Sequence, residues 1–154
     1  MSDVSTLKQN PQPLPPNSYR SRVSGRLDAD ISVDVGMPVT PDPTPEEPGG
    51  AIFFANAEST EALATVIGLA ASATEAGKAI TIQYAGPLSL PTERWDRVTG
   101  QTGGLTPNAV YYLDGLGLLT TLVASPSDWT TRIGVALTST TLMIAIEPPV
   151  AFSP

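Results

Sequence analysis

The sequence contains neither cysteine nor histidine. Without cysteine there is no disulfide framework and no thiolate nucleophile. Without histidine the usual nucleophile–base pairs and the commonest zinc sites are missing as well. These two absences argue against most enzymatic mechanisms, and they predict a protein that uses no metal and no cofactor.

Charge and aromatic residues are also scarce. Charged residues make up 15% and aromatic residues 6% of the 154 residues, and the net charge is −7. General nucleic-acid binding requires clustered lysine and arginine, so the acidic balance argues against a nucleic-acid partner. No apolar run is long enough to span a bilayer, and the polar N-terminus does not resemble a signal peptide. We therefore expect neither a nucleic-acid partner nor a membrane.

Proline and glycine, in contrast, make up about a fifth of the chain, with 16 and 13 residues. This composition favours turns and extended segments over long helices. Many of the prolines precede residue 50, whereas the apolar runs concentrate after it. We therefore predict an extended Pro-rich arm at residues 1–50, with a stiff linker at 38–50. Residues 51–154 are predicted to form a compact β module.

The arm itself contains a segment with strand character. Residues 27–35 alternate strictly between apolar and polar, which predicts a strand with one buried face. Because the segment lies outside the predicted module, we expect it to pair at a sheet edge of its own or of a neighbouring subunit. Three arginines precede this segment, and an acidic block from Asp28 to Glu47 follows the arginines. These charge blocks either pair between subunits or remain solvated.

The predicted partner contacts come from this arm and from the two tryptophans of the chain. They are Arg20, Arg22, Arg26, Leu27, Ile31, Val33, Val35, Trp95 and Trp129. For each tryptophan a sugar platform, an anchor between subunits and simple core or rim packing remain open.

The module contains one hairpin pattern twice, at residues 65–84 and 131–147. Each copy enters its first strand through Ile-Gly, at Ile67-Gly68 and Ile133-Gly134, and continues through a polar turn into a second apolar strand. Turn residues recur roughly every 8–12 residues along the module. The pattern predicts a mainly β fold, a small β-sandwich or barrel of about eight short strands.

The predicted strands share short apolar or alternating runs bounded by turn residues. They are residues 51–55, 66–71, 78–84, 88–90, 95–98, 109–113, 118–123, 132–137 and 141–146. Residues 59–64 are predicted to form one helical turn. A long alanine-rich helix over 60–76 competes with the strand at 66–71, and we favour the strand because the second copy lies among plain strands. Pro148-Pro149 is expected to end the sheet.

Carboxylates are the only remaining candidates for catalysis. The acids that could form a glycosidase-like pair are Glu93, Asp96, Asp114, Asp128 and Glu147. Each stands beside turn residues or at a strand end, where acids are commonly solvated. We therefore predict that the protein is not an enzyme.

Four segments in order resemble a known module. These are GLTPNAVYYLD at residues 104–114, GLLTT at 117–121, RIGVALT at 132–138 and TTLMI at 140–144. Together they resemble a small β module of tailed-bacteriophage virion proteins, found in capsid decoration (cement) proteins and near the C-termini of tail or fibre proteins. The resemblance covers about residues 64–147. Asn108 stands where glycine is commoner, and asparagine tolerates the positive φ that the turn requires.

The resemblance implies a non-enzymatic structural protein of the virion. We expect a homotrimer, made in the cytoplasm of the bacterial host, that sits on the capsid surface and stabilises the shell by binding the major capsid protein. The alternatives are a tail or fibre adaptor or receptor-binding module, and a carbohydrate-binding domain that uses the tryptophans.

Overall fold

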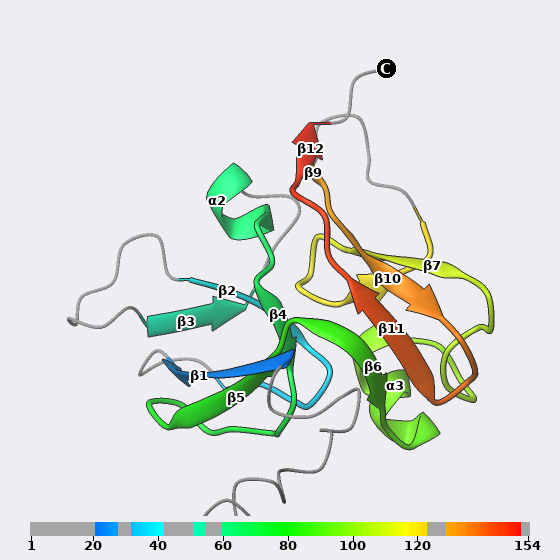
Figure 1. Cartoon of the computed structure of the whole chain (residues 1–154), viewed down its shortest axis with the longest axis horizontal. Coiled ribbons are helices and arrows are strands. Elements are labelled where there is room, and N and C mark those ends of the chain that lie inside the picture. The colour runs from blue at the N-terminus through cyan, green and yellow to red at the C-terminus, as the bar shows by residue number, and fades with distance from the viewer. Residues whose placement is uncertain (1–20, 28–31, 42–50, 55–59, 123–128, 152–154) are drawn as a thin grey trace, which may run out of the picture.

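The computed structural model describes residues 21–27, 32–41, 51–54, 60–122 and 129–151. In this part of the chain it has twelve strands and two helices, which confirms the mainly β fold (Figure 1). The first elements are β1 (Arg22–Leu27), β2 (Pro38–Pro41), β3 (Ala51–Phe54), α2 (Glu61–Ala64), β4 (Gly68–Ala70) and β5 (Ala79–Gln83). They are followed by β6 (Ala85–Ser89), α3 (Thr92–Thr99), β7 (Val110–Leu113), β8 (Leu119–Thr120), β9 (Trp129–Thr130), β10 (Arg132–Ala136), β11 (Thr141–Ala145) and β12 (Val150–Ala151).

Five strands of the N-terminal half pair in a closed ring, in the order β1, β3, β2, β4, β5. β5 is antiparallel to both β1 and β4, which places Ile82 opposite Val23 and Gln83 opposite Leu69. β3 is parallel to β1 and antiparallel to β2. Each strand of the ring therefore has a backbone partner on both sides.

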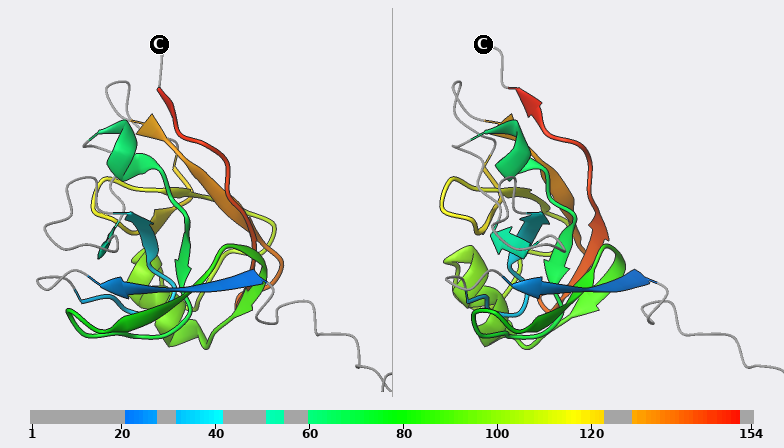
Figure 2. Two further views of the ribbon diagram at one scale, coloured as in Figure 1. Left: turned by 60° about the vertical axis from the view of Figure 1, so that its left-hand side comes forward. Right: turned by 90° about the vertical axis from the view of Figure 1, so that its left-hand side faces the viewer.

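The C-terminal half forms an antiparallel sheet in the order β6, β11, β10, β7, β8. Its central pair is the hairpin of β10 and β11, in which Gly134 lies opposite Ile144. β9 and β12 pair beyond the end of the same hairpin. Figures 1 and 2 show the ring on one side of the molecule and this second sheet on the other.

The two sheets share one hydrophobic core. The larger cluster of buried side chains includes Leu69 from the ring, Trp95 from α3, and Tyr111, Ile133 and Leu142 from the second sheet. A buried hydrogen bond also crosses between the halves, because Thr131 Oγ1 donates to the carbonyl oxygen of Ala64 (2.6 Å). The described parts of the two halves therefore form one packed body.

Both repeats of the hairpin pattern are antiparallel strand pairs, and each lies in a different sheet. β4 and β5 form the pair in the ring, and β10 and β11 form the pair in the second sheet. In both pairs the glycine lies where a neighbouring strand leaves no room for a side chain. A Cβ on Gly68 would contact Ile82 Cγ2 and lie 2.7 Å from Gln83 O, and a Cβ on Gly134 would meet Met143 O. Close backbone approach therefore explains the repeated Ile-Gly step.

Residues 60–76 do not form the long helix that their alanine content allows. α2 is a single turn, and it begins after Thr60, whose Oγ1 accepts a hydrogen bond from Leu63 N (3.3 Å). It ends at Thr65, where the backbone is extended, and β4 follows. The predictions of one helical turn and of a strand within 66–71 are confirmed.

One strand prediction is wrong, because residues 95–98 lie in the helix α3. Pro91 precedes this helix, and Gly100 ends it in the left-handed region at φ 72°. Trp95 and Val98 are three residues apart, so they share one face of the helix, and both are buried. The helix is only eight residues long, and its periodicity was therefore too short to stand out between strands.

The predicted arm is wrong for its described residues, because β1 and β2 belong to the ring. The strand spans Arg22–Leu27, not 27–35, and the stretch predicted as a linker from residue 38 begins with β2. Val33 forms an isolated bridge with Thr74 and is buried. The alternating apolar residues need a buried face, and the interior of the ring provides it. Residues 1–20, 28–31 and 42–50 lie outside the described residues.

Gln83 lies at the passage from the ring to the second sheet and is fully buried. Its Nε2 donates to the carbonyl oxygens of Ala85 (3.1 Å) and Pro87 (2.9 Å), and its Oε1 accepts from Arg22 Nε (3.2 Å). The side chain therefore satisfies two carbonyl groups of β6 and ties that strand to the end of β5.

Replacing Gln83 by glutamate is expected to lower the free energy of unfolding at pH 7 by about 3 kcal/mol, because the carboxylate has no proton for the two carbonyl groups. Urea unfolding at pH 7 measures the effect. The matched variant Gln83→Met loses the same two hydrogen bonds without placing a carboxylate next to the carbonyl oxygens, so a loss in Gln83→Glu no larger than in Gln83→Met would contradict this account.

Candidate functional site

Four of the residues predicted to contact a partner are buried inside the folded module, so their assignment as partner contacts is wrong. Leu27, Val33, Val35 and Trp95 are exposed by 1%, 4%, 9% and 0% of their surface. Leu27 and Val33 belong to the core cluster of the ring, and Trp95 belongs to the larger cluster. Alternating apolar residues look the same in sequence whether their face meets the chain's own core or a partner, so their pattern could not separate the two cases.

The predicted arginines of β1 lie nearer the surface. Arg22 is half-buried and donates to Gln83, whereas Arg26 is exposed and its Nε donates to Gly77 O (3.3 Å). In the acidic block, Asp34 lies 4.0 Å from Arg97 of the same chain. This pair favours an internal partner for Asp34 over a neighbouring subunit. Arg20 and Ile31 lie outside the described residues.

The segment 100–109 is a loop held by side-chain hydrogen bonds. Asp96 accepts from the backbone N–H groups of Gly103 (3.2 Å) and Gly104 (2.7 Å). The hydroxyl of Tyr111 accepts from Thr106 N (2.8 Å) and donates to Gln101 Oε1. Asp96 therefore shapes a loop.

The turn at Asn108 confirms the expected backbone conformation, and Asp114 shapes the turn after it. Asn108 has a positive φ of 68°, as predicted for the position where glycine is commoner. Asp114 Oδ1 accepts from Leu116 N (2.7 Å) and Leu118 N (2.9 Å), which closes the turn between β7 and β8. The motif residues in these loops therefore act in folding.

The remaining acids do not gather into a site. Glu93 is exposed in the first turn of α3, and Asp128 lies outside the described residues. Among the residues that the structure describes, no group of three or more acidic, histidine or cysteine side chains could hold a metal ion. Of the predicted acids that the structure describes, Glu147 lines a hollow.

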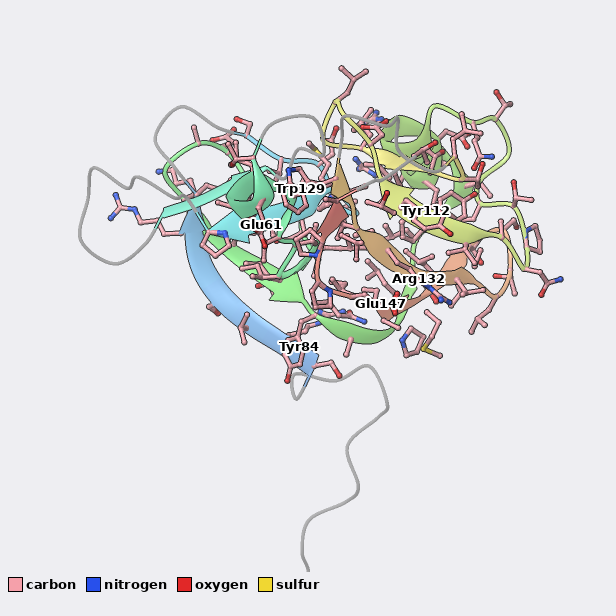
Figure 3. The ribbon with its side chains drawn as sticks, turned by 90° about the horizontal axis from the view of Figure 1, so that it is seen from above. Glu61, Tyr84, Tyr112, Trp129, Arg132 and Glu147 are labelled. Atoms are coloured by element: carbon pink, nitrogen blue, oxygen red, sulfur yellow. The ribbon has the colours of Figure 1, made fainter. Side chains whose placement is uncertain are left out.

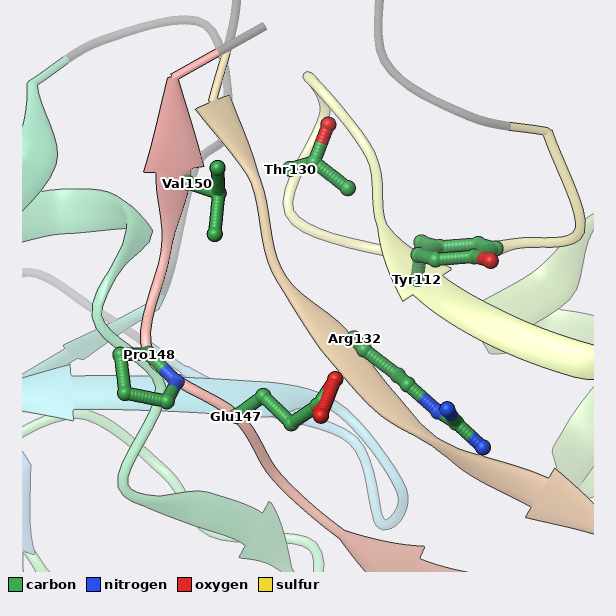
Figure 4. A pocket seen from close by; sticks show the side chains of 6 residues that line it. All are labelled: Tyr112, Thr130, Arg132, Glu147, Pro148 and Val150. Carbon is green, nitrogen blue, oxygen red and sulfur yellow. The ribbon is translucent and has the colours of Figure 1, made fainter.

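This hollow has a volume of about 410 Å³ and opens on the second sheet (Figure 4). The residues that line it come from β7, β9, β10, β12 and the segment that joins β11 to β12. They are Tyr112, Thr130, Arg132, Glu147, Pro148 and Val150. Of these residues the sequence pointed only to Glu147, and only as one of a pair of acids.

The hollow forms where the long hairpin of the second sheet is interrupted. β11 ends at Ala145, so the second sheet ends before Pro148-Pro149, as predicted. Beyond the prolines β12 pairs with β9 in a separate two-stranded sheet, which places Val150 opposite Thr130. Between the two ladders Glu147 N donates to Arg132 O (3.0 Å). The ladder between β10 and β7 shifts register just after Arg132. The sequence signal for the hollow was thus the proline pair that separates β11 from β12.

The residues that line the hollow differ in solvent exposure and in their polar partners. Tyr112 and Arg132 are half-buried, and Glu147 is exposed. Arg132 and Glu147 form no ion pair within the described part of the chain, and Figure 4 shows the Glu147 side chain reaching toward Arg132. Thr130 Oγ1 is buried and has no hydrogen-bond partner among the described residues.

Trp129, the second predicted tryptophan, is half-buried and packs against the larger core cluster. It does not line the hollow. Figure 3 shows it near Glu61 of α2 and apart from Tyr112, Arg132 and Glu147. Core packing, one of the alternatives predicted for this tryptophan, therefore accounts for its buried part.

Among the described residues, no helix is long and apolar enough to cross a bilayer. In comparisons with known proteins, no family model matches this chain, and no curated protein matches its sequence. The motifs and the geometry of the chain itself are therefore the basis for assigning its function.

Proposed function

We propose that this chain is a non-enzymatic structural protein of a tailed phage, which decorates the capsid and stabilises it by binding the major capsid protein. In this proposal the folded module is the outward body. Residues 1–20 extend onto the shell, and three copies assemble at junctions between capsid subunits.

The observation that carries the proposal is that the residues shared with phage virion modules build one unit of the structure. The four motif segments form the loops and most of the strands β7, β8, β10 and β11, which are neighbours in the second sheet. Asn108 and Asp114 shape its turns, and Gly134 allows its closest strand contact. Folding roles for shared residues are what we expect of a module that recurs in different virion proteins and attaches through other parts.

Exposed leucines beside an edge strand support attachment to a protein surface. Leu116 and Leu122 are exposed by 77% and 73% and lie on either side of β8, at the edge of the second sheet. Full burial of one such side chain against a partner contributes about 1.5–3 kcal/mol. We assign these two leucines as a second contact beside the predicted arm.

The tryptophans do not favour the carbohydrate-binding alternative in the form that the sequence suggests, because Trp95 is fully buried and donates through Nε1 to Thr140 O (2.8 Å). The tail or fibre alternative rests on the same resemblance as the capsid proposal. A location experiment separates the two.

The full chain is expected to bind expanded, empty capsids of its phage with a fixed number of copies per shell and to raise the melting temperature of the shell.

Removing residues 1–20 is expected to weaken binding at least about tenfold, a loss of about 1.4 kcal/mol. The folded module should survive this truncation, because β1 begins at Arg22. Removing residues 1–50 does not test attachment through the arm, because it also deletes β1 and β2 of the folded module. Co-sedimentation, calorimetry of the shells and circular dichroism of the variants provide the measurements.

Removing residues 152–154 is the matched truncation at the other end and should leave shell binding unchanged. Recovery of the protein with purified tails in place of capsids would overturn the capsid proposal in favour of the tail alternative. If the chain without residues 1–20 decorates shells as well as the full chain, attachment through the arm is wrong, and Leu116→Asp and Leu122→Asp then test the edge of the second sheet.

A further inference from the structure

The hollow at the interrupted hairpin brings an aromatic ring, a cation and an anion to one face of the second sheet. Tyr112 and Arg132 are cross-strand partners on β7 and β10, so their Cβ atoms lie about 4.5–5.5 Å apart. Glu147 reaches the same space from the segment that joins β11 to β12, where its backbone N–H donates to Arg132 O. Figure 4 shows the Tyr112 ring beyond Arg132 as seen from Glu147.

The polar groups of this hollow define the charge of a suitable ligand. The Arg132 guanidinium only donates hydrogen bonds, and the ionised Glu147 carboxylate only accepts them. One positive and one negative group line the same space. An anionic ligand would therefore be repelled by Glu147, and a cationic ligand would be repelled by Arg132. A neutral ligand that both donates and accepts hydrogen bonds satisfies both groups without a charge penalty.

The apolar groups define the shape of that ligand. Tyr112 offers a half-buried ring, and Pro148 and the 64% exposed Val150 offer aliphatic surface on the opposite wall. The volume of about 410 Å³ falls within the range of small-molecule sites, about 300–1,000 Å³. A pyranose ring combines an apolar C–H face with hydroxyl groups that donate and accept at its rim.

From these features we propose that the hollow is a binding site for a neutral saccharide. The C–H face of the sugar stacks on Tyr112, and neighbouring hydroxyl groups accept from Arg132 and donate to Glu147. The site differs from the tryptophan platform that the sequence suggests, and it does not depend on the proposed attachment to a capsid. An open hollow with few polar groups is expected to bind single sugar units with millimolar dissociation constants.

The test uses the isotopically labelled full chain and nuclear magnetic resonance titration with neutral methyl glycosides of glucose, galactose, mannose and N-acetylglucosamine. At least one glycoside is expected to shift amide signals clustered at residues 112, 130–132 and 147–150. Tyr112→Ala is expected to weaken binding about tenfold, and Arg132→Gln and Glu147→Gln by a similar factor. The affinity should not change with salt concentration, because the ligand is uncharged.

Tyr84→Ala is the matched control, because Tyr84 is a tyrosine exposed by 41% that does not line the hollow. It should leave glycoside binding unchanged. Titrations with acetate and methylammonium ions test the charge argument, and stronger binding of either ion than of every glycoside would overturn the proposal. The absence of clustered shifts with all four glycosides, or an equal loss of binding in Tyr84→Ala and Tyr112→Ala, would do the same.

Discussion

Replacing Trp95 by alanine is expected to lower the free energy of unfolding by about 3–5 kcal/mol, because the largest buried side chain of the shared core is removed and a cavity remains. The indole also donates through Nε1 to Thr140 O (2.8 Å), so the truncation leaves a carbonyl of the β10–β11 turn without this partner. For a chain of this length the change corresponds to a decrease in melting temperature of roughly 6–20 °C. Urea unfolding and scanning calorimetry measure both quantities.

Trp95→Phe separates the two contributions, because phenylalanine fills much of the space but cannot donate to Thr140. We expect it to retain most of the stability that Trp95→Ala loses. A loss below about 1 kcal/mol for Trp95→Ala, the size typical of an ordinary substitution, would show that α3 does not pack on the second sheet as described. The assignment of Trp95 to the core would then be wrong, and the predicted contact of Trp95 with a partner would again be open.

Replacing Gly134 by alanine is expected to lower the free energy of unfolding by at least about 3 kcal/mol, at the upper end of the cost of overpacking. The added Cβ would meet Met143 O and lie 3.2 Å from Ile144 Cα, and both are backbone atoms of the paired strand. Backbone cannot move aside as a flexible side chain can, so the hairpin of β10 and β11 must separate. Chemical denaturation followed by circular dichroism provides the measurement.

Gly100→Ala is the matched control for this variant, because it strains the backbone conformation without bringing the added Cβ close to other atoms. Gly100 has a φ of +72°, and a Cβ added there would meet nothing within 4 Å, so alanine costs only the left-handed backbone, about 1–2 kcal/mol. Gly134 has no positive φ, so the loss of stability in Gly134→Ala comes from the close contact alone. A smaller loss for Gly134→Ala than for Gly100→Ala would contradict the close approach of the two strands. Gly68→Ala extends the test to the first copy of the hairpin.

The strands were predictable where a local pattern reports them. Short apolar runs and turn residues located β3, β4, β5, β7, β10 and β11, and the repeated Ile-Gly step located both hairpins. The turn at Asn108 was also predictable, because its backbone conformation depends on the residue itself. In each case the pattern that identifies the element lies within a few consecutive residues.

The errors concern contacts between distant segments. β1 pairs with β5, more than fifty residues away, and no local pattern shows that residues 22–27 close a ring with a strand beyond the predicted linker. Proline content suggested an arm, yet Pro38 and Pro41 are the end residues of the strand β2. Trp95 was misassigned for a related reason, because the surface that buries it comes from the β strands of both halves.

The sequence by itself determined that the chain is mainly β, lacks the usual catalytic and zinc-binding residues and repeats a hairpin whose first strand is entered through Ile-Gly. These features follow from residue type and local spacing. Only the tertiary structure decided that residues 21–41 belong to the module where it describes them, that Leu27, Val33, Val35 and Trp95 are core residues, and that Tyr112, Arg132 and Glu147 line one hollow. The physical reason is that burial and site geometry depend on which strands pair, and strand pairing joins residues that are far apart along the chain.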